Sequence, residues 1–311
     1  MKIIDRITPF LFLIIFISSG NTSQAADKWA LLVGINSYQN NISPLRFCVS
    51  DVEAFQKLLV NPDIAGFEAD KVYLMTEKQT GSNLPTHVNV IKRLSILAKM
   101  IQPEDTFVFY FSGHGMTRDG QSFLLAENSD SSSVDTLKVT AIPLENVSDI
   151  LSRIKASQVL SVIDACRNDP TSARSDRDNL LSDAFVRGIK VTRATNISGI
   201  PSVTATLYAC NVGERAYEWA EKGHGVFSYY LLEGLRGSAA DNNGEITVTN
   251  LADYTQKKVA VWVREQEGKK QTPWLEQSGG AKLILARISK QPEPQLVAPV
   301  KVEEVSTTAT L

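Results

Sequence analysis

Hydrophobic residues occur in short, nearly continuous runs that are separated by segments of helical spacing. The runs lie at 29–35, 71–75, 107–111, 159–163 and 203–209. Because apolar residues fill these runs instead of alternating with polar ones, each run predicts a strand that is buried on both faces of a parallel sheet.

The intervening segments predict helices. Ser50 and Glu53 have capping-box spacing, and Val52, Phe55 and Leu59 would then share one helix face. Further helices are predicted at 85–101, 144–154, 226–235 and 249–264. Alternating strands and helices favour an α/β fold in which helices cover both faces of a mostly parallel central sheet.

The two ends of the chain differ from this block. Residues 1–26 combine Lys2 and Arg6 with an apolar run at 10–17, which predicts a signal peptide and therefore export to the periplasm or the medium. The run is too short for a stable membrane span. Residues 289–311 contain three prolines and no aromatic residue, which predicts a disordered tail. Residues 27–288 are expected to form the folded domain.

The charge and the cysteine count limit which partners and how many disulfides can be expected. The 32 basic and 34 acidic residues give a net charge of −2, so nothing in the charge favours a nucleic acid. Three cysteines cannot form a framework of several disulfides, and they leave at least one thiol unpaired. Cys48 and Cys210 are predicted to be buried apolar residues, which directs attention to Cys166.

Two polar segments follow predicted strands, where the carboxyl ends of a parallel sheet hold ligands. Ser112-Gly113-His114-Gly115 follows one strand, and Asp164-Ala165-Cys166 follows another. A thiol attacks a carbonyl as thiolate, and His114 is the available base for Cys166. The backbone N–H groups of Gly115 and Cys166 are candidate donors to the oxyanion. His87 and His224 are predicted to have structural roles.

Six segments in this order resemble the caspase-like peptidases (peptidase C14, the clan of caspases, metacaspases and paracaspases), and most closely their bacterial members. They are WALLVGINSY, PLRFCVSDVEAF, FVFYFSGHG, VLSVIDACRNDP, LYACNVGERAYE and GHGVFSYYLLEGL. The resemblance implies a three-layer α/β/α sandwich and a cysteine endopeptidase with Cys166 as nucleophile and His114 as base.

The resemblance also implies a polypeptide substrate with Arg or Lys before the scissile bond, the P1 position. Asp164 stands where the members that cleave after basic residues carry an acid, and Asp51 matches a second pocket acid. Asp51 could equally serve the helix N-terminus. Glu214, like Glu218, could rim the pocket or form a solvated face.

The segment 167–195 resembles the linker between the two parts of such enzymes. Its basic residues are candidate sites of self-cleavage, and they are Arg167, Arg174, Arg177, Arg187, Lys190 and Arg193. The stretch 239–246 resembles half of a calcium loop but lacks an acidic residue at both anchor positions, so a turn is expected there. No cofactor or metal is predicted, although activation by calcium elsewhere is left open.

Two function classes remain. The first is the exported endopeptidase, and the second is a caspase-like binding or scaffold module with little or no turnover. No pattern in the sequence favours a particular oligomeric state.

Overall fold

The computed structural model describes residues 26–166, 182–189, 191–193 and 196–288. The predicted tail, the predicted signal peptide apart from Ala26, and most of the predicted linker lie outside these residues.

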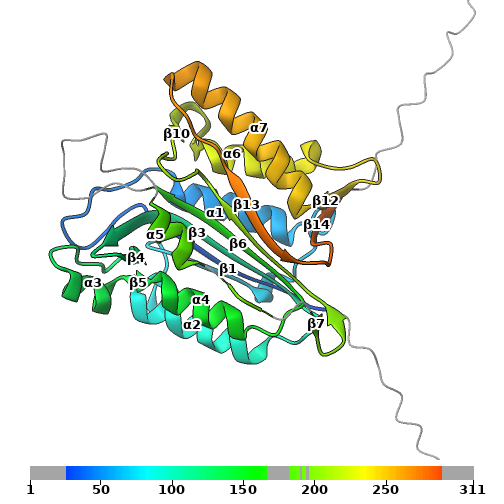
Figure 1. The fold of residues 1–311 in the computed structure, drawn as a ribbon, viewed down its shortest axis with the longest axis horizontal. Coiled ribbons are helices and arrows are strands. Elements are labelled where there is room, and N and C mark those ends of the chain that lie inside the picture. Colours follow the sequence, from blue (N-terminus) through cyan, green and yellow to red (C-terminus); the bar gives the residue numbers. More distant parts are fainter. Residues whose placement is uncertain (1–25, 167–181, 190, 194–195, 289–311) are drawn as a thin grey trace, which may run out of the picture.

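A central sheet of eight strands organises the molecule (Figure 1). Its parallel strands run in the spatial order β9-β6-β3-β1-β2, and antiparallel β13 pairs with β9 at one edge. Antiparallel β4 extends the end of β3 and pairs with β5. The bounds are β1 Lys28–Gly34, β2 Val72–Thr76, β3 Thr106–Arg118, β4 Gln121–Leu124, β5 Ile142–Pro143, β6 Gln158–Cys166, β9 Val203–Tyr208 and β13 Trp274–Gly279.

Helices cover both faces of this sheet, which confirms the predicted α/β/α layering (Figure 1). One face carries α1 (Cys48–Val60), α6 (Val226–Glu233) and α7 (Val248–Glu267), and the other carries α2 (His87–Met100), α4 (Leu144–Arg153) and α5 (Asp183–Gly188). Because strand side chains alternate between faces, Val108 and Tyr110 join the first core, whereas Phe107 and Phe109 join the second.

Shorter elements complete the described chain. The helices are α3 (Val134–Thr140) and the single turns η1 (Ala69–Lys71), η2 (Gly81–Asn83), η3 (Ala220–Lys222) and η4 (Gly234–Ser238). The two-stranded pairs are β7 (Asn196–Ile197) with β8 (Ile200–Pro201), β10 (Glu218–Trp219) with β11 (His224–Gly225), and β12 (Glu245–Thr247) with β14 (Ile284–Arg287). Among the described residues, no helix is both long and apolar enough to cross a bilayer.

Two local predictions were wrong. The capping box does not form, because α1 begins at Cys48 after Phe47, and the Ser50 hydroxyl donates instead to the carbonyls of Phe47 and Gly223. Both strands that precede the polar segments are longer than predicted: one continues to Arg118, so Ser112–Gly115 lies within β3, and the other continues to Cys166, so Asp164–Cys166 lies within β6. Pairing with β6 on one side and β4 further along holds this glycine-containing stretch extended.

Candidate active site

Strands β3 and β6 bring His114 and Cys166 together. The two strands pair in parallel over nine residue pairs, and the last pair is His114 opposite Cys166. Neighbouring strands lie about 4.8 Å apart. Positions that are 52 residues apart in the chain are therefore direct neighbours in the sheet.

The loop between β1 and α1 fixes the orientation of His114. The His114 side chain is fully buried, and its Nε2 lies 2.7 Å from the carbonyl oxygen of Ser43. Because a carbonyl can only accept, Nε2 must carry the hydrogen, and Nδ1 is the basic nitrogen of the neutral imidazole. The His114 backbone N–H donates to the Tyr38 hydroxyl at 2.8 Å, and the two rings lie 5.1 Å apart.

Gly115, a predicted oxyanion donor, is required by packing. A Cβ at this position would lie 2.6 Å from the ring of Phe185 and 3.1 Å from Cβ of Ala165. Phe185 belongs to α5 and is fully buried. The absence of a side chain at Gly115 therefore lets α5 pack directly against the strand that carries His114.

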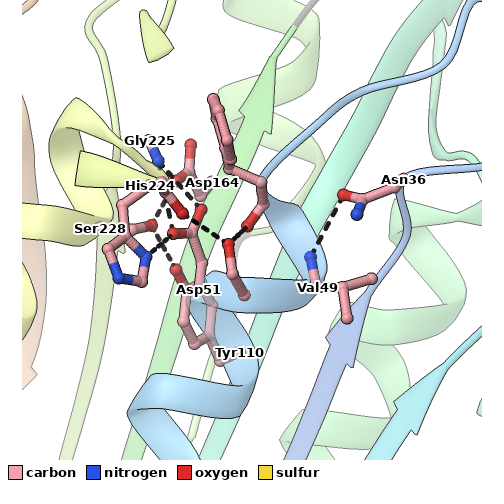
Figure 2. Close-up of polar contacts among 11 residues, drawn as sticks. Asn36, Val49, Asp51, Tyr110, Asp164, His224, Gly225 and Ser228 are labelled. Atoms are coloured by element: carbon pink, nitrogen blue, oxygen red, sulfur yellow. Dashed lines mark hydrogen bonds and ion pairs between the residues drawn. The ribbon is translucent and has the colours of Figure 1, made fainter. Parts of the chain in front are cut away.

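Asp51 and Asp164 form a buried acidic pair (Figure 2). Asp51 lies in the first turn of α1 and Asp164 on β6, and they are 2% and 5% exposed. A Cβ on Gly225 would lie 3.3 Å from an Asp51 carboxylate oxygen and 3.4 Å from one of Asp164. Asp51 lies in the first turn of α1, its carboxylate bonds to His224 and Gly225, and no side chain caps this helix.

Each carboxylate has its own hydrogen-bond partners (Figure 2). Asp51 Oδ1 lies 2.6 Å from His224 Nδ1, and the Gly225 N–H lies 3.3 Å from both Asp51 oxygens. Ser228 donates to Asp164 Oδ2 at 2.7 Å. The Ser228 oxygen is 2.5 Å from the Tyr110 hydroxyl, which therefore donates to it. Sequence reasoning missed His224, Ser228 and Tyr110.

Burial makes both acids harder to ionise. Desolvation raises the pKa of Asp51 to about 6, although the contact with His224 opposes the rise. Desolvation and the negative charge of Asp51 raise the pKa of Asp164 to about 7. A cation that entered between them would lower both pKa values, so the pair is suited to bind a positively charged group.

The acids lie at a small cavity of about 10 Å³, which has room for about one water molecule. Its other lining residues are Leu45, Phe47, Cys48, Ser112, Tyr217, Glu218 and Gly225. Apolar and acidic side chains therefore both line this cavity. A larger cavity lined by Arg193, Thr204 and Gln277 lies toward the amino ends of β6 and β9, away from His114.

The structure places the predicted pocket residue Glu214 elsewhere. Its carboxylate accepts hydrogen bonds from the backbone N–H of Asn211 and from both the N–H and the hydroxyl of Thr272. Glu218 lines the pocket instead and pairs with Arg46 at 2.7 Å.

Other predicted features are also located. Cys48 and Cys210 are buried and form no disulfide, as predicted. His87 opens α2, and its Nδ1 lies 3.1 Å from the Val139 carbonyl. At 239–246, Asp241 accepts the backbone N–H groups of Asn243 and Glu245, which forms the expected turn. Within the described part of the chain, no three His, Cys, Asp or Glu residues cluster as metal ligands.

Comparisons with known proteins agree with this architecture. A family model described as the caspase domain matches residues 27–284. Metacaspase-1 of Yarrowia lipolytica is 39% identical over 89 residues, which cover 28% of this chain and 19% of that protein. A protein of a Desulfuromonadales bacterium, named a probable protease, is 27% identical over 226 residues, 68% of this chain and 26% of that protein. The chain thus spans about a quarter or less of these two relatives.

Solved structures share the fold. The crystal structure of caspase-1 from Spodoptera frugiperda superposes with a TM-score of 0.52 at 13% identity, over 86% of this chain and 93% of that one. A protein from Geobacter sulfurreducens gives a TM-score of 0.54 at 15% identity, over 82% and 94% of the two chains.

Proposed function

Because this chain belongs to the caspase domain family of cysteine-type peptidases, we propose that it is an endopeptidase with Cys166 as nucleophile and His114 as base. The observation that carries the proposal is the register that sets His114 opposite Cys166 at the carboxyl end of β6. Ser43 supports the role of His114, because its carbonyl holds the hydrogen on Nε2.

The proposed reaction has two halves. His114 Nδ1 accepts the thiol proton of Cys166, and the sulfur attacks the scissile carbonyl. Gly115 and Cys166 N–H groups stabilise the oxyanion, and the imidazolium then protonates the leaving amine. Water, activated by His114, hydrolyses the thioester and regenerates the thiol. Apart from this water, the scheme uses only groups of the protein. Comparing hydrolysis rates in calcium and in EGTA would reveal activation by calcium.

We propose that substrates have Arg or Lys at P1. Asp51 and Asp164 support this preference, because two buried carboxylates favour a cation and disfavour an acidic side chain.

Hydrolysis of a fluorogenic Arg peptide tests the proposal. We expect Cys166→Ala to lower kcat/KM by about 10⁴-fold or more. The buried Cys210→Ala variant is the matched thiol control, and an Asp peptide should not be cleaved. If the wild-type protein bound the Arg peptide without hydrolysing it, the scaffold function would replace the peptidase.

We also propose self-processing in the linker 167–193. Arg193 is an unfavourable cleavage site, because its guanidinium donates to the carbonyls of Ile154 and Ala156. The other basic residues of the segment remain candidates. Incubated wild-type protein should yield two bands on a denaturing gel and Cys166→Ala only one, whereas identical patterns would contradict self-processing.

Export remains a proposal that rests on the signal-peptide pattern of residues 1–26. Fractionation of cells that express the full chain should recover the protein in the periplasm or the medium, shortened at its amino end. Full-length protein in the cytoplasm would contradict it.

A further inference from the structure

A histidine contacts one of the two acids of the pocket without lining the pocket itself. His224 lies on β11, and its side chain is 18% exposed, whereas Asp51 is nearly inaccessible. The contact between His224 Nδ1 and Asp51 Oδ1 joins residues 173 positions apart (Figure 2). His224 thus lies at the boundary between solvent and the buried carboxylates.

Few other charges near His224 could neutralise the acids. The ionisable groups on the elements around it are Cys48, Asp51, Glu53 and Lys57 on α1, Glu218 on β10, Glu221 and Lys222 on η3, and Tyr229, Tyr230 and Glu233 on α6, with Tyr110 of β3 and Asp164 of β6 beside the acid pair. Lys57 lies in the last turn of α1, whereas Asp51 lies in the first. Glu218 is paired with Arg46, and the Lys222 ammonium lies over the rings of Trp219 and Tyr229. His224 is the basic side chain in contact with Asp51.

Two carboxylates that are held out of water can both stay ionised only if a positive charge lies beside them, and this holds before any substrate binds. Without it, they neutralise by taking up protons. An imidazole can supply a positive charge and can also lose it between pH 5 and 8, which an arginine cannot. His224 can therefore place a positive charge beside Asp51 and can lose that charge by releasing a proton.

We propose that His224 is the resident counter-cation of the specificity pocket. A basic P1 side chain takes over the ion pair with Asp51, and the His224 imidazole then releases its proton from Nδ1 to solvent. This inference rests on the proposed function. It makes proton release part of substrate binding, so affinity for a P1 arginine increases as the pH rises from 5 to 8.

Nitrogen NMR of labelled histidines tests the exchange directly. The chain has three histidines, and His224→Gln identifies the signal. In Cys166→Ala protein at pH 7, where the Asp51 carboxylate is ionised, we expect a charged His224 imidazole that becomes neutral when a blocked peptide with P1 Arg is added. A peptide with neutral citrulline at P1 is the control and should leave His224 charged. An imidazole that is neutral without peptide, or still charged with saturating Arg peptide, would overturn the inference.

Replacing His224 by lysine, which keeps its positive charge at pH 8, provides the kinetic test. At pH 8, we expect the KM of an Arg peptide to be at least tenfold higher for His224→Lys than for His224→Gln, with kcat values within threefold. His87→Gln, far from the pocket, is the matched control for loss of an imidazole. Equal KM values for the Lys and Gln variants would contradict the proposal.

The experiments distinguish failure of the proposed function from failure of the counter-cation role of His224. If the Arg peptide neither bound nor was hydrolysed, the proposed function would be wrong. If the peptide bound and His224 kept its proton, only the counter-cation role would be wrong.

Discussion

Asp164 is a carboxyl group that folding makes harder to ionise. Its pKa of about 7 lies above the value of an exposed aspartate, so the folded protein binds more protons than the unfolded chain between about pH 4 and 7. Stability from this group is therefore complete below pH 4 and is lost as the pH rises through 7.

Replacing this acid should stabilise the protein at alkaline pH. At pH 8, we expect Asp164→Asn to raise the free energy of unfolding by a few kcal/mol, which corresponds to about 5 °C or more in Tm. Near pH 4.5 the difference should nearly vanish, and kcat/KM for an Arg peptide at pH 8 should fall at least about 100-fold. Thermal unfolding at both pH values, with exposed Asp149→Asn as control, measures the effect. A pH-independent change would contradict the assigned burial penalty.

Tyr38 is a positioning residue for His114. Tyr38→Phe leaves the buried N–H of His114 without its hydroxyl acceptor, at a cost of about 1–3 kcal/mol. We expect kcat to fall about tenfold while KM stays within threefold, because the acid pair is unaffected. Steady-state kinetics would show this, with Tyr73→Phe on β2, two strands away, as control. A change confined to KM would argue against the role.

At this scale, the position after predicted strands selected His114 and Cys166, and the resemblance to the family added Asp164 and Asp51. It could not find the partner of Asp51, because no local pattern links residues 51 and 224. The Gly223-His224-Gly225 motif was the available signal, but its structural interpretation omitted the pocket. Glu214 was chosen over Glu218 because both follow β9 and only tertiary contacts separate them.

Helix α5 packs closely against β3 because Gly115 has no side chain there. Gly115→Ala would press a methyl group into Phe185 and should cost about 1–3 kcal/mol. Because alanine keeps the backbone N–H, the combined variant with Phe185→Leu should recover part of both stability and kcat. Urea unfolding of the single and double variants measures this coupling. Gly280→Ala, which would meet no atom within 4 Å, is the control. Strict additivity would rule out the packing explanation.

Buried strands were predictable because both of their faces are apolar. Strands β1, β2 and β9 begin and end within one residue of the prediction, whereas β6 begins one residue earlier and ends three residues later. The extension of β3 was not predictable, because its glycines disfavour a strand. Pairing with β6 up to His114 and with β4 from Gly115 onward keeps this stretch extended. Antiparallel β13 was missed for a related reason. Most of its side chains are exposed, and its pairing with β9 leaves no hydrophobic run.

The whole molecule shares its sheet and core between the segments that flank the linker. Strand β9 pairs with β6, and Val203 and Phe227 belong to the same core as Leu160. After a cut between residues 167 and 181, the two pieces should therefore co-elute in size-exclusion chromatography and separate only in denaturant. A protease site inserted between residues 170 and 180 provides the cut if self-processing is absent. Separate elution in plain buffer would contradict the shared core.

The pocket also draws on both sides of that linker. The carboxylates of Asp51 and Asp164 come before it, whereas His224, Gly225 and Ser228 come after it. A nascent polypeptide that had emerged only as far as residue 200 would already possess its thiol and imidazole, yet lack half of the groups that recognise a target. The proposed cleavage after Arg or Lys therefore depends on segments from both sides of the linker.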